Sequence, residues 1–150
     1  MIFAVGSMVY VSMLKLGFTG TRNGITRSQR RAAIGHLDRW SLKYDLLEVH
    51  HGDCIGADSD FHDLCTQFWG KELRVVIHPP VDSSRRAWKS YQKQITLSPV
   101  DFIKRNHDIV ASVDGMLAAP AESQEILRSG TWATIRHARK TGVPLILLNP

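Results

Sequence analysis

The chain has only two cysteines among its 150 residues, Cys54 and Cys65. Small secreted domains that depend on a disulfide framework carry more cysteines than this, so the sequence argues against that class of protein. Free thiols persist in a reducing compartment. We therefore expect a cytoplasmic protein.

The first dozen residues lack both a basic leader and a long uninterrupted apolar run. Secretory signal peptides need the first feature and membrane spans need the second, so we predict no signal peptide and no membrane partner. The length and the 43% hydrophobic content fit a single core. We interpret residues 1–12 as an N-terminal extension or an extra strand, and residues 13–150 as one domain.

Two common nucleotide-binding fingerprints are also missing. The glycine-rich stretch of residues 19–24, TGTRNG, fits neither G-x-G-x-x-G nor the Walker pattern, which ends in Gly-Lys-Ser/Thr. The sequence therefore predicts neither a typical dinucleotide-binding site nor a P-loop ATPase. The net charge of +5 favours phosphorylated partners in general, but it does not distinguish a nucleotide from a nucleic acid.

What the sequence does contain is a regular alternation of apolar runs with helical patterns. We predict strands at residues 14–18, 46–50, 73–77, 115–119 and 143–148, and helices after residue 26 and at residues 57–69, 100–112 and 131–141. Continuous apolar strands alternating with helices are typical of a parallel sheet that is covered on both faces. With right-handed crossovers, they predict a Rossmann-like doubly wound α/β domain whose mainly parallel five-stranded sheet has the order 3-2-1-4-5.

The stretch of residues 79–99 is bounded by prolines and does not fit this alternation. We expect it to be the least regular part of the chain, with residues 85–94 as a candidate short helix.

Three of the predicted strands run into turns of small residues that precede helices. The residues of these turns are Gly20, Thr21 and Arg22; Gly52, Cys54, Gly56 and Ala57; and Ser129, Gly130, Thr131 and Trp132. The start of a helix offers unpaired N–H groups and a partial positive charge, which bind anions. Because all three turns follow carboxyl ends of strands, they share one edge of the sheet, and we predict one composite pocket for a phosphorylated small molecule.

Each of these residues also has a plainer interpretation. A glycine turn can simply allow tight packing, although Arg22 favours an anion site because guanidinium matches phosphate. Asp58 either caps its helix or accepts hydrogen bonds from sugar hydroxyls. Arg105 and Asn106 either belong to a solvated basic face or reach into the crevice, and Trp132 either stacks on a base or packs in the core.

A metal site is the other interpretation of residues 50–62, which combine imidazole, carboxylate and thiol groups. Their spacing matches no zinc pattern. We predict no metal and no cofactor, and we assign Gly52 and Gly56 to shaping the turn.

Together these segments resemble the SLOG superfamily, the Rossmann-like group that includes the Lonely Guy phosphoribohydrolases and DNA-processing protein A, and in particular its small YpsA-like members. The resemblance extends over residues 13–148 and rests on four motifs: Gly20-Thr21-Arg22, the segment from Gly52 to Asp58, Arg105-Asn106, and Ser129-Gly130-Thr131-Trp132. It implies a nucleotide-derived ligand with its phosphate at Gly130-Thr131 and its sugar near Asp58 and Arg105. By analogy, it also implies a homo-oligomer.

The resemblance is incomplete at the catalytic position. Lonely Guy enzymes carry Pro-Gly-Gly-x-Gly-Thr-x-x-Glu, whereas Thr134 stands here in place of the glutamate and residues 121–128 are inserted. The carboxylates that remain as substitutes are Asp58, Glu122 and Glu125. Cleavage of an N-glycosidic bond needs a group that activates water or stabilises the developing positive charge.

Our leading hypothesis is a nucleotide-binding protein that hydrolyses the N-glycosidic bond of a nucleoside 5′-monophosphate, with Asp58 and Arg105 as catalytic residues. Two alternatives stay open. The first is a non-catalytic sensor or carrier of a nucleotide-derived ligand, which the threonine at position 134 favours. The second is a single-stranded nucleic-acid binder, which the many arginines favour.

Overall fold

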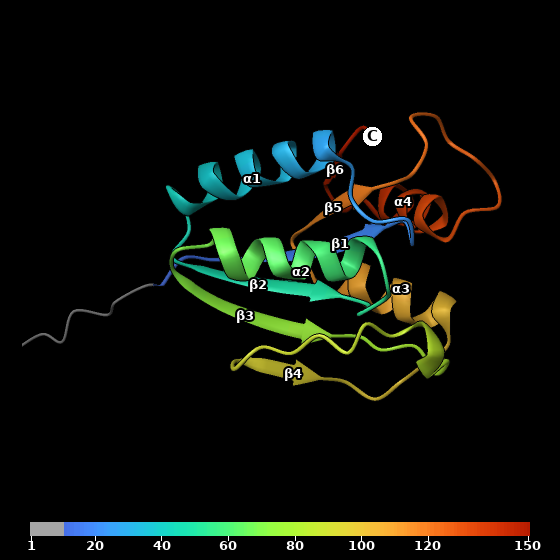
Figure 1. The fold of residues 1–150 in the computed structure, drawn as a ribbon, viewed down its shortest axis with the longest axis horizontal. Coiled ribbons are helices and arrows are strands. Elements are labelled where there is room, and N and C mark those ends of the chain that lie inside the picture. The colour runs from blue at the N-terminus through green and yellow to red at the C-terminus, as the bar shows by residue number, and fades with distance from the viewer. Residues whose placement is uncertain (1–10) are drawn as a thin grey trace, which may run out of the picture.

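The structure is a computed structural model that describes residues 11–150 (Figure 1). The predicted extra strand within residues 1–12 therefore lies almost wholly outside the described residues. The strands are β1 (Met13–Gly20), β2 (Leu46–His51), β3 (Glu72–Ile77), β4 (Gln94–Thr96), β5 (Gly115–Ala119) and β6 (Leu145–Leu147). The helices are α1 (Arg27–Ser41), α2 (Ala57–Phe68), α3 (Phe102–Ala111) and α4 (Gly130–Thr141), with a 3₁₀ turn at Ser83–Arg85.

The strands form one open sheet in the order β4-β3-β2-β1-β5-β6, and every pair is parallel. The predicted doubly wound class is confirmed, and so is the order of the five predicted strands. The predicted number is wrong by one, because Gln94–Thr96 adds an edge strand beside β3. Three residues with one apolar side chain show no periodicity, so only pairing with β3 makes this segment a strand.

The candidate helix at residues 85–94 is also wrong. The backbone of Trp88 has a φ of 57°, a left-handed conformation that interrupts a right-handed helix. The segment is instead fixed to the loop after β2. The amide of Ala87 donates to the carbonyl of Asp53 (2.7 Å), and the amide of Lys89 donates to the carboxylate of Asp53 (2.9 Å).

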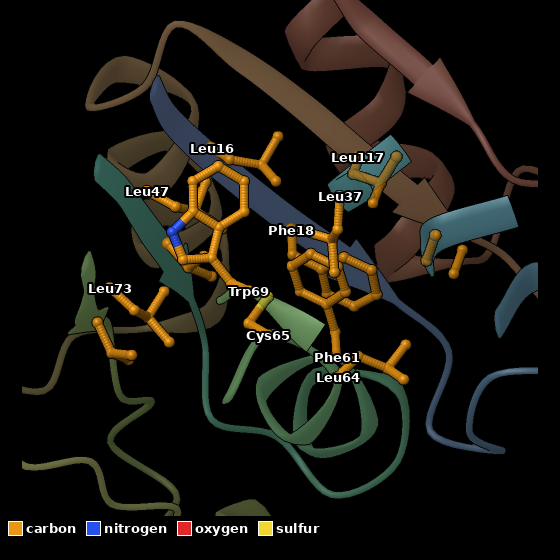
Figure 2. Close-up of a cluster of buried hydrophobic side chains, with 14 of the residues drawn as sticks. Leu16, Phe18, Leu37, Leu47, Phe61, Leu64, Cys65, Trp69, Leu73 and Leu117 are labelled. Carbon is orange, nitrogen blue, oxygen red and sulfur yellow. The ribbon is translucent and has the colours of Figure 1, made fainter. Parts of the chain in front are cut away.

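Successive residues of the central strands face opposite layers of the protein. Phe18 of β1 points toward α2 and stacks on Phe61, with 4.3 Å between ring centroids (Figure 2). The preceding residue, Gly17, faces the opposite side of the sheet, where an added Cβ would meet Met116 and Ile109. This alternation places α1 and α2 against one core and α3 and α4 against another.

Capping residues set the starts of α1 and α4. α1 begins at a capping box in which Thr26 and Gln29 exchange side-chain and backbone hydrogen bonds. α4 begins at Ser129, whose hydroxyl accepts from the amide of Trp132, and ends at Gly142 in the left-handed conformation with φ 80°. The predicted helix at residues 131–141 is thereby confirmed.

No helix among residues 11–150 has the length and apolar character needed to cross a bilayer.

Candidate functional site

The carboxyl edge of the sheet carries a cavity of about 510 Å³. The loops after β1, β2 and β5 line it together with residues of α3. Residues from all three glycine turns meet here. The sequence-predicted residues that line the cavity are Gly20, Thr21, Arg22, Gly52, Cys54, Asp58, Arg105, Asn106, Ser129, Gly130 and Thr131.

The turn between β5 and α4 has free hydrogen-bond donors. The Ser129 hydroxyl accepts a hydrogen bond from the amide of Trp132 at 3.2 Å. The amides of Gly130 and Thr131 have no acceptor within residues 11–150, as expected for the first turn of a helix. A Cβ added at Gly130 would meet nothing within 4 Å, so this turn is open to the cavity.

Two arginines of the cavity wall are also without an ion-pair partner among residues 11–150. Arg22 and Arg128 both line the cavity, and neither forms an ion pair with any residue in the described part of the chain. Guanidinium groups and free amides together favour an oxyanion such as phosphate. This end of the cavity can therefore hold an anionic group.

Arg105 lies at the other end, and its charge is almost completely buried, with 4% of the residue exposed. Its Nη1 donates to the carbonyls of Gly52 (3.0 Å) and His78 (3.3 Å), and its Nε donates to the Asn106 side chain (2.8 Å). A Cβ at Gly52 would overlap the guanidinium. Arg105 thus locks the loop after β2 to α3 while it lines the cavity.

Asp58 is the buried carboxylate of the cavity, and it does not cap α2. Its Oδ2 accepts from the amide of Cys54 at 3.1 Å, which closes the loop before the helix. Burial raises the pKa of Asp58 to about 6, because desolvation penalises the charged form more than the nearby Arg105 charge favours it. A carboxyl group with this pKa exchanges protons near neutral pH.

Cys54 lies between these two charged groups. Both Nη atoms of Arg105 are 3.6 Å from its Sγ. Burial nevertheless raises the pKa of the Cys54 thiol, and the Asp58 charge raises it further. The thiol therefore stays protonated near neutral pH and is a poor nucleophile.

Three predicted site residues do not line the cavity but support its walls. Gly56 is the residue before α2, and with φ 101° it lies against the backbone of Arg22, where a Cβ would clash. Ala57 is fully buried and donates its amide to the carbonyl of Thr21 at 2.9 Å. Trp132 is 2% exposed and lies in the core, where its indole donates to Glu122.

The carboxylates that could replace the missing family glutamate fall into two groups. Thr134, at the family position, is buried, and its hydroxyl donates to the Gly130 carbonyl one turn back. Glu125 pairs with Arg136 at 3.2 Å and does not line the cavity. Asp58 and Glu122 remain as the carboxylates of the cavity wall.

Four histidines behind the loop after β2 are buried and hydrogen-bonded, which the sequence analysis did not anticipate. The Asp53 amide donates to Nδ1 of His51 (2.9 Å), Nε2 of His51 contacts Nδ1 of His62 (3.0 Å), and Nε2 of His62 contacts the Ser90 carbonyl (3.1 Å). Every donor in this series of hydrogen bonds has an acceptor when both imidazole rings are neutral.

Within residues 11–150, no group of three or more His, Cys, Asp or Glu side chains is placed to hold a metal ion.

The cavity residues that the sequence analysis missed include Arg128, Arg85 and Phe102. Arg128 directly precedes the α4 turn and was hidden inside the inserted residues 121–128. Arg85 and Phe102 belong to no motif and reach the cavity only because of the loop path after β3. Adjacency to a predicted turn was the signal for Arg128, whereas no local signal existed for the other two.

Comparison with known proteins adds evidence on the fold. Neither a protein-family model nor a curated protein sequence matches the chain. Among solved structures, the chain is similar to the molybdenum cofactor binding protein from the phototrophic bacterium Rippkaea orientalis, with a TM-score of 0.67 and 18% sequence identity. The alignment covers 92% of this chain and 77% of that one. A similarity at this low sequence identity shows a shared fold, which is Rossmann-like.

Proposed function

We propose that this protein is a SLOG-like binding protein that holds a nucleotide or a nucleotide-derived phosphorylated molecule in the cavity at the sheet edge. The free amides of Gly130 and Thr131, which open onto that cavity, are the observation that carries the proposal. The similar structure from Rippkaea orientalis is of a protein named for binding a cofactor, which supports ligand binding on this fold.

The size and charge of the cavity also favour such a ligand. A volume of about 510 Å³ lies within the usual range of small-molecule sites. Its charged lining consists of four arginines and two carboxylates: Arg22, Arg85, Arg105, Arg128, Asp58 and Glu122. The excess of positive charge favours an anionic ligand.

Substitution of Gly130 tests the proposal. Gly130→Asp introduces a negative charge at the anion site, while an acidic residue in the first turn of a helix is favourable for folding. Gly130→Asn is the matched neutral control. We expect calorimetry to show binding of nucleoside 5′-monophosphates to the wild type, and at least about a tenfold weaker affinity for Gly130→Asp than for Gly130→Asn, as expected when a charge-assisted contact is replaced by repulsion.

Two outcomes of this experiment contradict the proposal. One is wild-type protein that binds neither nucleoside monophosphates nor inorganic phosphate. The other is equal affinity of the two Gly130 variants. Binding that weakens steeply with salt would favour the nucleic-acid alternative, because a polyanion releases many counterions while a single phosphate contact releases few.

Hydrolysis of the N-glycosidic bond is the second candidate function, and the pKa of about 6 for Asp58 favours it. In its ionised form, this carboxylate takes a proton from a water molecule whose oxygen bonds to the anomeric carbon. The N-glycosidic bond breaks, the base leaves with its electron pair, and the base then takes up the proton. We expect chromatography to detect free base and ribose 5-phosphate from a nucleoside monophosphate, and Asp58→Asn to abolish their release. Binding without any release of base would instead favour the sensor or carrier alternative.

A further inference from the structure

A second, smaller cavity of about 170 Å³ lies beside the main one. It shares Arg22, Cys54, Arg85 and Phe102 with the main cavity and adds Ile55 and Ser84. The two spaces are therefore neighbours that have part of their walls in common. We refer to the smaller one, defined by these six residues, as the side chamber.

The chemistry of the side chamber differs from that of the α4 turn. Ile55 is an apolar side chain that is 53% exposed beside the cavity. The aromatic ring of Phe102 and the protonated thiol of Cys54 form the rest of the apolar wall. Covering apolar surface of this kind with an apolar part of a ligand lowers the free energy of the complex. The α4 turn instead offers hydrogen-bond donors to an anion.

Flat guanidinium groups surround the ring of Phe102. The Cζ of Arg105 lies 5.1 Å from the ring centroid, and the Cζ of Arg85 lies 5.3 Å from it. Arg105 is held by buried hydrogen bonds, whereas the one ion pair of Arg85 within residues 11–150 is with the exposed Asp82 at 3.5 Å. Guanidinium groups stack on planar rings, so Arg85 can cover a ring that enters the chamber.

We infer that the side chamber is the subsite for the planar aromatic end of the ligand, while the phosphate lies at the α4 turn. This inference rests on the proposed function and sharpens it. The site then selects ligands that carry both a phosphate and a ring of the nucleobase type, and it discriminates against simple sugar phosphates.

Two exposed isoleucines provide a matched test. Ile55→Asn makes the chamber wall polar, and Ile103→Asn makes the same change at a residue that is 71% exposed and lines neither cavity. The probes are the four common ribonucleoside 5′-monophosphates and ribose 5-phosphate, measured by calorimetry. We expect Ile55→Asn to weaken binding of the preferred nucleotide about five- to tenfold, a loss that matches partial removal of apolar contact.

The same variant should leave the affinity for ribose 5-phosphate unchanged, and Ile103→Asn should change neither affinity. Phe102→Leu, which keeps an apolar side chain but removes the ring, should weaken nucleotide binding as well. The inference is overturned if wild-type protein binds ribose 5-phosphate as tightly as the best nucleotide, or if Ile55→Asn weakens both ligands equally. Absence of binding by every phosphorylated probe overturns the proposed function as well, so the two failures are distinguishable.

Discussion

Two turns of this protein look alike in sequence but differ in structure. Both the β2–α2 loop and the β5–α4 turn follow a strand, contain glycine and lead into a helix. In the β2–α2 loop the polar groups have partners: Arg105 binds the Gly52 carbonyl, Asp58 binds the Cys54 amide, and Ile55 donates to Arg85. In the β5–α4 turn, the first amides face open space.

The contrast shows that glycine serves two purposes at one sheet edge. At Gly52 and Gly56, the missing Cβ lets a guanidinium and a backbone approach closely, so these glycines stabilise the fold. At Gly130, the missing Cβ leaves space in the cavity. Substitutions in the first loop should therefore reduce stability, whereas substitutions in the second should affect ligand binding.

The largest effect is expected for Asp53, which anchors the first loop. Its carboxylate is fully buried and binds Arg86 at 3.1 Å, so Asp53→Ala should lower the free energy of unfolding by about 3–5 kcal/mol. Asp82→Ala is the control, because Asp82 forms an exposed pair with Arg85 and should lose less than about 1 kcal/mol. Chemical denaturation measures both, and similar losses would refute the anchoring role.

Gly56→Ala should have the next largest effect. Its φ of 101° disfavours any L side chain, and the new methyl group would meet the backbone of Arg22, which cannot turn away as a side chain can. We expect a loss of about 2–3 kcal/mol in the free energy of unfolding. A melting temperature equal to that of the wild type would show that the two loops do not need this close approach.

Acidification should destabilise the first loop through the histidines behind it. Burial lowers the pKa of His50, His51 and His62, and it lowers the pKa of His78 to about 4. The unfolded chain takes up these protons near pH 6.5 and the folded chain does not, so their contribution to stability is complete above pH 6.5. Each such group then costs about 1.4 kcal/mol per pH unit as the pH falls toward its folded pKa.

Asp58 acts in the opposite direction. Its pKa of about 6 lies above the unfolded value, so its cost to folding disappears as the pH falls from 6 to 3.8. We expect denaturation curves between pH 7 and 4 to show a net loss of stability, since four histidines outweigh one carboxyl group. His78→Gln should make this pH dependence shallower, and an unchanged slope would contradict the assignment of His78 as a buried neutral group.

The smallest effect is expected for Gly130→Ala. The added methyl group meets nothing, and alanine is the better helix former, so the free energy of unfolding should rise by about 0.5 kcal/mol or stay unchanged. Gly70→Ala is the control, because it also points into open space but lies away from the cavity. A clear loss of stability in Gly130→Ala alone would remove the contrast between the two turns.

Local patterns predicted most of the fold. The apolar runs of β1, β2, β3 and β5 and the helical patterns between them lie within short stretches of sequence, so the alternation of strands and helices followed from them. β4 escaped because its pairing with β3 is tertiary. Trp132 was equally compatible with ring stacking and with core packing, and only its burial against Ala118 and Ile135 distinguished them.

The sequence by itself determined the alternation of strands and helices and the glycine turns that open three of those helices, because these depend on periodicity and backbone freedom over a few residues. The tertiary structure decided in which turn the polar groups have hydrogen-bond partners and in which the amides are free. It buried Arg105 and Asp58, brought Arg85 and Phe102 to the cavity, and left Gly130 free. Burial and desolvation depend on neighbours far along the chain, which no local pattern specifies.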